Sequence, residues 1–265
     1  MNIRAIAFDL DGTVLENGVV PSHLFNRLRR FAEAGGILIP ATGRTLDAIL
    51  SILEQSGFLA AVGYSQFMVP GQKWVFERDR SGYTPLGDYN EIYLKKWTAN
   101  LKKVREYLSR CEEELSAVGI THDIWQRFEE DQSTTGHIDV CFPRNGDEEQ
   151  GESILISGFR PVLDIQVTGN GNLRIIMLAG YGKGEALAYI AKTAGIPSDR
   201  ILAIGDDLND TSMLDGRFGF LSATLANAHP RILRAVKSIN GFIARGAGSA
   251  GFAEVMDWIQ SNGKL

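Results

Sequence analysis

Cysteine, long apolar runs and excess positive charge are all scarce in this sequence. It has two cysteines among 265 residues, Cys111 and Cys141, which lie too far apart for a C-x-x-C motif. Two cysteines cannot form the disulfide framework of a small secreted domain, and no His/Cys cluster has zinc-ligand spacing. We therefore expect free thiols in a reducing compartment, which excludes disulfide scaffolds and zinc fingers.

The sequence also lacks segments that would direct it into or across a membrane. No apolar run approaches the roughly 18 residues that a membrane-spanning helix needs. The first residues, MNIRAIAF, are followed by an aspartate too soon to form a signal peptide. We expect a cytoplasmic protein without a membrane partner.

The charge balance is slightly acidic, with a formal net charge of −5. This argues against a nucleic-acid-binding protein or one that binds anionic lipid, but it is compatible with a local basic pocket for a small anion. Apolar residues make up 44% and charged residues 22% of the chain, as in ordinary globular proteins. The chain therefore has enough apolar material for a sizeable core.

Strand and helix patterns alternate at both ends of the chain, which is typical of βαβ units in a parallel sheet. The expected strands cover residues 3–8, 37–41, 60–62, 201–204 and 218–221. Helical spacing of apolar residues is found in 21–34, 45–56, 184–194, 208–214, 230–236 and 250–259. Residues 68–76 resemble a hairpin turned by Pro70 and Gly71. These ends, 1–82 and 180–265, are expected to form one α/β core domain.

The middle of the chain follows a different order. A long charged helix is expected at 91–115, strands at 122–128 and 137–142, a helix at 147–157, and strands at 162–167 and 173–178. The sequence Gly-Asn-Gly-Asn between the last two strands is a strong hairpin signal. The order αββαββ predicts an antiparallel sheet with helices on one face, so 83–179 is expected to be an inserted α+β domain.

Polar clusters follow three of the expected core strands, and one more opens a helix. They are Asp9-Leu10-Asp11-Gly12-Thr13, Ala41-Thr42-Gly43-Arg44, Gly182-Lys183-Gly184 and Gly205-Asp206-Asp207-Leu208-Asn209-Asp210. Each cluster alone has an ordinary interpretation as a turn, a helix cap or a surface charge. In a parallel sheet, however, the carboxyl ends of the strands meet at one edge, where ligands bind.

Together the clusters place four carboxylates, those of Asp9, Asp11, Asp206 and Asp210, at that edge. Such a group requires a cation, and oxygen ligands without His or Cys favour Mg²⁺. Mg²⁺ commonly also binds a substrate phosphate, for which the Thr42 hydroxyl, backbone N–H groups and the Lys183 ammonium are suitable partners. The residues therefore predict a phosphoryl-transfer site.

The four clusters, in this order and with an insert between the second and the third, resemble the haloacid dehalogenase-like hydrolases. The insert resembles the type II cap of the subgroup that contains Cof-like and sucrose-phosphatase-like sugar phosphatases. The resemblance implies a Rossmann-like three-layer core with a central, mostly parallel sheet and an inserted α+β cap. It also implies a Mg²⁺-dependent phosphatase that hydrolyses a small phosphate monoester, for which a sugar phosphate is the first candidate.

The resemblance assigns roles to the acidic residues. Asp9 would be the nucleophile that forms an aspartyl-phosphate, and Asp11 would protonate the leaving group and then deprotonate the water. The metal would be held by Asp9, by the backbone carbonyl of Asp11 and by Asp206. Asn209 and Asp210 would orient these groups or the waters on the metal.

The remaining motif residues would bind the phosphoryl group. Thr42 and the Gly43 amide would hold its oxygens, and Lys183 would bridge the phosphate and the nucleophile. Asp207 is expected to face away or to cap a helix. For Arg44, contact with substrate and a structural salt bridge remain equal alternatives.

Substrate choice is expected to come from the sheet of the insert. The candidate residues there are His122, Arg127, His137, Asp139, Asn170 and Arg174. One stretch, 62–66, departs from the Asn-Gly that relatives often have after the third strand. Two alternatives to a phosphatase remain: a phosphotransferase or phosphomutase using the same intermediate, and a non-catalytic metabolite-binding protein. The sequence leaves the oligomeric state open.

Overall fold

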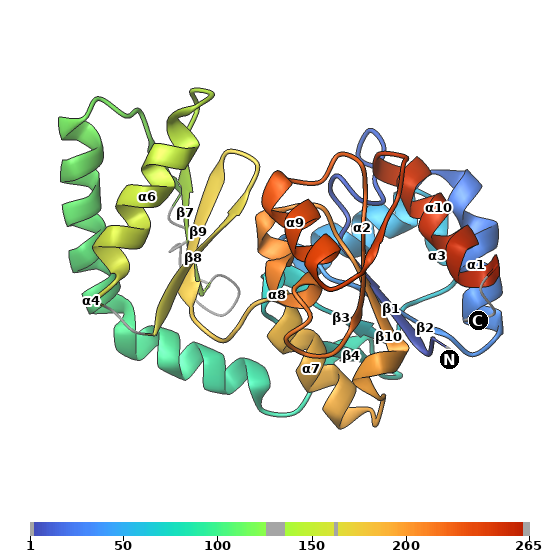
Figure 1. Cartoon of the computed structure of the whole chain (residues 1–265). Coiled ribbons are helices and arrows are strands. Elements are labelled where there is room, and N and C mark those ends of the chain that lie inside the picture. Colours follow the sequence, from blue (N-terminus) through green and yellow to red (C-terminus); the bar gives the residue numbers. More distant parts are fainter. Residues whose placement is uncertain (1–2, 126–135, 162–163, 262–265) are drawn as a thin grey trace. The chain divides into compact units, whose positions relative to one another are not determined.

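The structure, a computed structural model, describes residues 3–125, 136–161 and 164–261. The chain divides into two compact units, Met1–Tyr89 with Gly182–Leu265, and Asn90–Tyr181 (Figure 1). Among the described residues, no helix combines the length and the apolar character required to cross a bilayer. Each unit is described separately below.

The first unit is built on a parallel sheet of five strands. The order is β12 (Phe242–Ile243), β11 (Leu221–Thr224), β10 (Ile201–Ile204), β1 (Ala5–Phe8) and β2 (Ile37–Pro40). Every side chain of β1 and β10 is buried, because helices cover both faces of the sheet. This burial explains why both strands are continuous apolar runs instead of alternating patterns.

Helices lie on the two faces of this sheet (Figure 1). They are α1 (Phe25–Glu33), α2 (Leu46–Gln55), α3 (Phe58–Ala61), α7 (Lys183–Thr193), α8 (Thr211–Leu214), α9 (Pro230–Ser238) and α10 (Gly248–Ser261), with short 3₁₀ turns η1 (Ser22–Leu24), η3 (Ser198–Arg200) and η4 (Leu208–Asp210). On one face, Phe8 of β1 packs edge to face on Phe252 of α10, with ring centroids 5.6 Å apart. The expected α/β class with a central parallel sheet is confirmed.

Two expected strands of this unit are misplaced. Residues 60–62 do not form a strand, because Phe58–Ala61 is the short helix α3, which begins after Gly57 in a left-handed conformation. Leucine and alanine suit a helix, and Phe58 fills the core beneath α1. Residues 218–221 were expected as a strand, but a turn at Gly216 and Gly219 delays β11 until Leu221.

A small antiparallel sheet lies beside the end of β2. It consists of β3 (Phe67–Met68), β4 (Phe76–Arg78) and β5 (Tyr83–Pro85), with the 3₁₀ turn η2 (Pro70–Gln72) between the first two. The expected hairpin about Pro70 and Gly71 is therefore present. Val69 continues β3 alongside β2, since its N–H donates to Pro40 at 2.9 Å.

The second unit contains an antiparallel sheet with the strand order β6 (Asp123–Trp125), β7 (Ile138–Cys141), β9 (Leu173–Leu178) and β8 (Ile165–Asn170). The long helix α4 (Tyr89–Ala117) and α6 (Asp147–Phe159) lie on one face of it (Figure 1). The β8–β9 hairpin turns through Gly171 in the left-handed region, as the Gly-Asn-Gly-Asn sequence predicts.

The strand register shows which side chains of this sheet face the helices. Arg174 pairs with Val140 across the β7–β9 ladder, so the two side chains share a face. That face carries α6, because Arg174 Nε donates to Glu152 Oε2 of α6 at 2.7 Å and both residues are buried. His137 and Asp139 alternate with these positions and point to the opposite face.

We predict that Arg174→Ala strongly destabilises the protein, because it leaves the buried Glu152 carboxylate without its partner. The loss in free energy of unfolding should be about 3–5 kcal/mol, measured by urea unfolding. The exposed pair of Arg110 and Glu106 in α4 is the control, and Arg110→Ala should cost less than about 1 kcal/mol. Equal losses for the two variants would contradict this interpretation of Arg174.

Candidate active site

Lys183 lies at the centre of the site, at the first residue of α7. Its side chain is fully buried, and its ammonium lies 2.7 Å from Asp9 Oδ1 and 2.6 Å from Asp210 Oδ1. The helix begins here because Glu185 accepts a hydrogen bond from the Gly182 N–H and closes its first turn. The cap therefore fixes the point from which Lys183 reaches the sheet edge.

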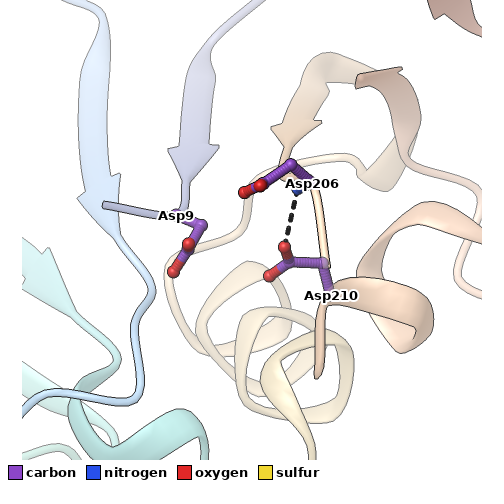
Figure 2. A group of neighbouring side chains, drawn as sticks. All are labelled: Asp9, Asp206 and Asp210. Atoms are coloured by element: carbon purple, nitrogen blue, oxygen red, sulfur yellow. Dashed lines mark hydrogen bonds between the residues drawn. The ribbon is translucent and has the colours of Figure 1, made fainter. Parts of the chain in front are cut away.

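Three carboxylates converge at the carboxyl ends of β1 and β10 (Figure 2). Asp9 follows β1, Asp206 follows β10, and Asp210 lies in η4. Asp210 Oδ2 accepts the N–H groups of Asp206 at 2.9 Å and Asp207 at 3.0 Å, which folds the loop back on itself. Thr13, from the loop after β1, donates to Asp206 Oδ1 at 2.7 Å.

The electrostatics of this group reflect buried like charges. Burial, with a further contribution from Asp210, raises the pKa of Asp206 to about 7. Burial also raises the pKa of Asp9 well above its usual range, although Lys183 opposes that shift. Burial lowers the pKa of Lys183, but the charges of Asp210 and Asp9 outweigh it and leave the pKa raised. The lysine is therefore a fixed cation.

The three carboxylates have the arrangement of a divalent metal site. Their ligand oxygens lie within 4.8 Å of one another. Asp9, Asp206 and Asp210 surround a single ammonium, that of Lys183, so a divalent ion would relieve the remaining repulsion. Asn209 is also buried beside them, and within the described residues neither its side-chain nitrogen nor its oxygen has a hydrogen-bond partner. An all-oxygen donor set fits a hard cation.

The loop after β2 brings Arg44 to Asp11. The guanidinium donates to both carboxylate oxygens, from Nε at 2.8 Å and from Nη2 at 2.7 Å. The Thr42 hydroxyl accepts the Arg44 N–H at 3.3 Å, and Thr45 caps α2 through the Ala48 N–H. Of the two alternatives for Arg44, the structure therefore places it in a salt bridge with Asp11.

The expected residues in the core fall into two sets. Asp9, Asp206, Asp210 and Lys183 are in direct contact or adjacent, with Thr42, Gly43, Arg44 and Asp11 on the neighbouring loops. Asp207 stands apart, since its carboxylate caps η4 through the Leu208 N–H at 2.7 Å.

The candidate substrate-binding residues of the second unit differ in their surroundings. His137 Nε2 lies 3.4 Å from Asp139 Oδ1 on the face of the sheet opposite α6, and both side chains are buried. Arg174 is held on the helix side by Glu152. His122 Nδ1 lies 3.2 Å from the Ile120 carbonyl oxygen, and Asn170 ends β8. Arg127 lies outside the described residues.

The sequence motifs do not include Asn227, which binds the same group. Its Nδ2 donates to Asp206 Oδ2 at 3.0 Å and to the Gly12 carbonyl at 2.9 Å, while its Oδ1 accepts the Gly248 N–H at 2.8 Å. It therefore joins the loops after β1, β10 and β11 to the start of α10. Its position shortly after β11, at the same sheet edge, was the only signal in the sequence.

Comparison with known proteins agrees with this fold. The family model described as haloacid dehalogenase-like hydrolase matches residues 6–66 and 89–248. A phosphoglycolate phosphatase from Methanoculleus marisnigri is 23% identical over 88% of this chain and 88% of its own length. Another, from Methanothrix thermoacetophila, is 34% identical, but over 39% of this chain and 44% of its own length.

A solved structure extends the likeness over nearly the whole chain. The sucrose-phosphatase from Synechocystis, in complex with sucrose and phosphate, has a TM-score of 0.71 and 15% identity, covering 98% of this chain and 99% of that one. At this identity the likeness concerns the fold. Since the family model covers most of the sequence, this chain belongs to the haloacid dehalogenase-like hydrolases, and the resemblance inferred from its motifs is confirmed.

We predict that Asn227→Ala weakens Mg²⁺ binding, because Asp206 loses the donor that orients its second oxygen. Removal of such a supporting hydrogen bond typically lowers metal affinity about 10–100-fold. Isothermal titration calorimetry with Mg²⁺ measures the change, and Asn26→Ala on the exposed surface of α1 is the control. Unchanged affinity in Asn227→Ala would show that this residue does not orient Asp206.

The stabilisation by Mg²⁺ should increase with pH. Without metal, the folded protein keeps a proton on Asp206 up to about pH 7, whereas the unfolded chain releases it near the ordinary value of 3.8. Stability of the metal-free protein therefore falls as pH rises through that window, and metal replaces the proton at its upper end. Melting temperatures with Mg²⁺ or with chelator, from pH about 5 to about 8, test this. Asp206→Asn should make the dependence shallower, with the remaining slope due to Asp9, whose pKa is also raised. An unchanged slope in this variant would contradict the assignment to Asp206.

Proposed function

We propose that this protein is a Mg²⁺-dependent phosphatase that hydrolyses a phosphate monoester of a small metabolite. The observation that carries the proposal is the contact of Lys183 with Asp9, inside a buried group of carboxylates at the sheet edge. A lysine paired with a single carboxylate would be equally compatible with a purely structural ion pair. Here it connects the expected nucleophile to the acids that are suited to hold a metal.

Asp9 acts as the nucleophile in the proposed reaction. One of its oxygens attacks phosphorus, the bond between phosphorus and the ester oxygen breaks, and an aspartyl-phosphate forms. Asp9, Asp206 and the Asp11 carbonyl would hold a metal ion, with Asn209 and Asp210 beside it, and the bound ion would supply the positive charge that keeps Asp9 ionised and offsets the phosphate. Lys183, the Thr42 hydroxyl and the Gly43 N–H hold the phosphoryl oxygens.

Asp11 transfers the protons. It gives a proton to the departing alkoxide and then takes one from the water that attacks phosphorus, which releases inorganic phosphate and restores Asp9. Arg44 holds both oxygens of Asp11, so this pair opens before Asp11 acts as an acid. The incoming phosphate dianion is a competing partner for the guanidinium.

The substrate is proposed to be a sugar phosphate or a similarly small phosphorylated metabolite. The relatives named phosphoglycolate phosphatase and the solved sucrose-phosphatase both support a small phosphate ester as substrate. Their names differ in the organic group that carries the phosphate. His137 and Asp139 are the proposed contacts in the second unit, since they lie on the face of its sheet opposite α6 and Glu152. A screen of phosphorylated sugars and hydroxy acids, ranked by kcat/KM, would identify the organic group of the substrate.

We predict that Asp9→Asn abolishes turnover of p-nitrophenyl phosphate, because an amide cannot form the acyl phosphate. The loss in kcat should exceed about a thousandfold, with a folded protein by circular dichroism. Asp207→Asn is the matched control: it retains the cap of η4 and should keep full activity. Failure of the wild type to release phosphate from any ester with Mg²⁺ would refute the phosphatase. Transfer of phosphate to a second hydroxyl, without free phosphate, would identify a phosphotransferase.

A further inference from the structure

The turn η2 supports the loop that is proposed to bind phosphate. The Gln72 N–H donates to the Thr42 carbonyl at 2.8 Å, and the Gly71 N–H donates to the Arg44 carbonyl at 2.8 Å. The Thr42 N–H donates in turn to the Val69 carbonyl at 3.0 Å. This turn belongs to residues 67–88, the segment between the two regions that the family model matches.

Gln72 has an unfavourable backbone conformation. Its φ is +67°, in the left-handed region that glycine adopts readily and glutamine rarely does. The residue is only 3% exposed, and within the described part of the chain its hydrogen bonds are made by its backbone. A strained, buried residue whose side-chain amide is not used in the fold points to a functional role.

The side chain of Gln72 lies over Gly43. A methyl group placed on Gly43 would lie 3.8 Å from Gln72 Nε2 and 3.9 Å from its Cγ, which is ordinary van der Waals contact. The amide therefore faces the residue whose N–H is proposed to hold a phosphoryl oxygen. It carries two N–H donors and no charge, so it adds hydrogen bonds to an anion without competing for the carboxylates.

We propose that the Gln72 side-chain amide donates a hydrogen bond to the phosphoryl group, beside the Thr42 hydroxyl and the Gly43 N–H. This inference rests on the proposed function, because it assumes that the loop of Thr42 and Gly43 binds phosphate. The left-handed backbone of Gln72 is then explained, because it directs the side chain toward Gly43 while the backbone N–H of Gln72 donates to the Thr42 carbonyl. Glycine would relax the backbone but remove the donor.

The test separates binding from folding. Gln72→Gly relieves the strained φ, which offsets the loss of a buried side chain, so the variant should remain folded with a cooperative melting transition. Its dissociation constant for inorganic phosphate, measured by calorimetry with Mg²⁺ present, should rise by on the order of tenfold, as expected for a lost hydrogen bond to a charged group. Gln72→Asn tolerates the same φ but has a shorter side chain, and it should also lose phosphate affinity.

Exposed Gln66, immediately before this segment, provides the control, and Gln66→Ala should bind phosphate like the wild type. Wild-type phosphate affinity in both Gln72 variants, or an equal loss in Gln66→Ala, would overturn the inference. This outcome is distinct from failure of the proposed function, which is an absence of Mg²⁺-dependent phosphate release by the wild type. An active wild type with unaffected Gln72 variants would leave the phosphatase standing and remove Gln72 from the site.

Discussion

The ion pairs of Lys183 are the interaction on which the geometry of the site depends. A fully buried ammonium is tolerable only with anionic partners, and Asp9 and Asp210 supply them from the ends of two different elements. Asp210 also holds the N–H groups of Asp206 and Asp207. The lysine therefore fixes the loop after β10 as well as the orientation of Asp9, and the position of Asp206 follows from that loop.

Close approach of the loops imposes a second constraint, which explains two glycines in the motifs. A methyl group on Gly205 would lie 2.4 Å from the carboxyl carbon of Asp210, and one on Gly12 would lie 2.3 Å from Asp206 Oδ2. Gly12 also has a φ of +75°. The carboxylates can gather at the edge of β1 and β10 only because no side chain intervenes. These glycines serve packing as much as turn formation.

The sequence predicted the parts of the fold and site that follow from local order. Buried parallel strands ending in polar turns identified β1, β2 and β10, and parallel pairing then implied that Asp9, Thr42 and Asp206 share one edge. The prediction failed for α3, because a run of four apolar residues is too short for its periodicity to distinguish a helix from a strand, and its packing against α1 is not visible in the sequence. Short apolar runs cannot be assigned without that tertiary context.

Pairings between distant side chains could not be predicted either. In the sequence, Arg174 is an ordinary polar residue of an expected strand. Only the register of β7 with β9 and the ion pair with Glu152 show that it faces α6. Asn227 is a single amide in a loop without a motif, and its contacts with Gly12 and Gly248 depend on how three loops meet. Such residues are defined by the three-dimensional arrangement, whereas Asp9 and Asp11 are defined by their spacing.

The pair of Arg44 and Asp11 is a further constraint on the proposed reaction. The guanidinium donates to both carboxylate oxygens of Asp11, so Arg44 occupies the oxygens that the reaction requires for proton transfer. In the proposed reaction, the phosphoryl group and Asp11 compete for the same Arg44. In that proposal, a phosphoryl group that binds Arg44 frees the oxygens of Asp11, which then takes up a proton from solvent before it protonates the leaving group. The salt bridge would thus link occupancy of the phosphate loop to the availability of Asp11.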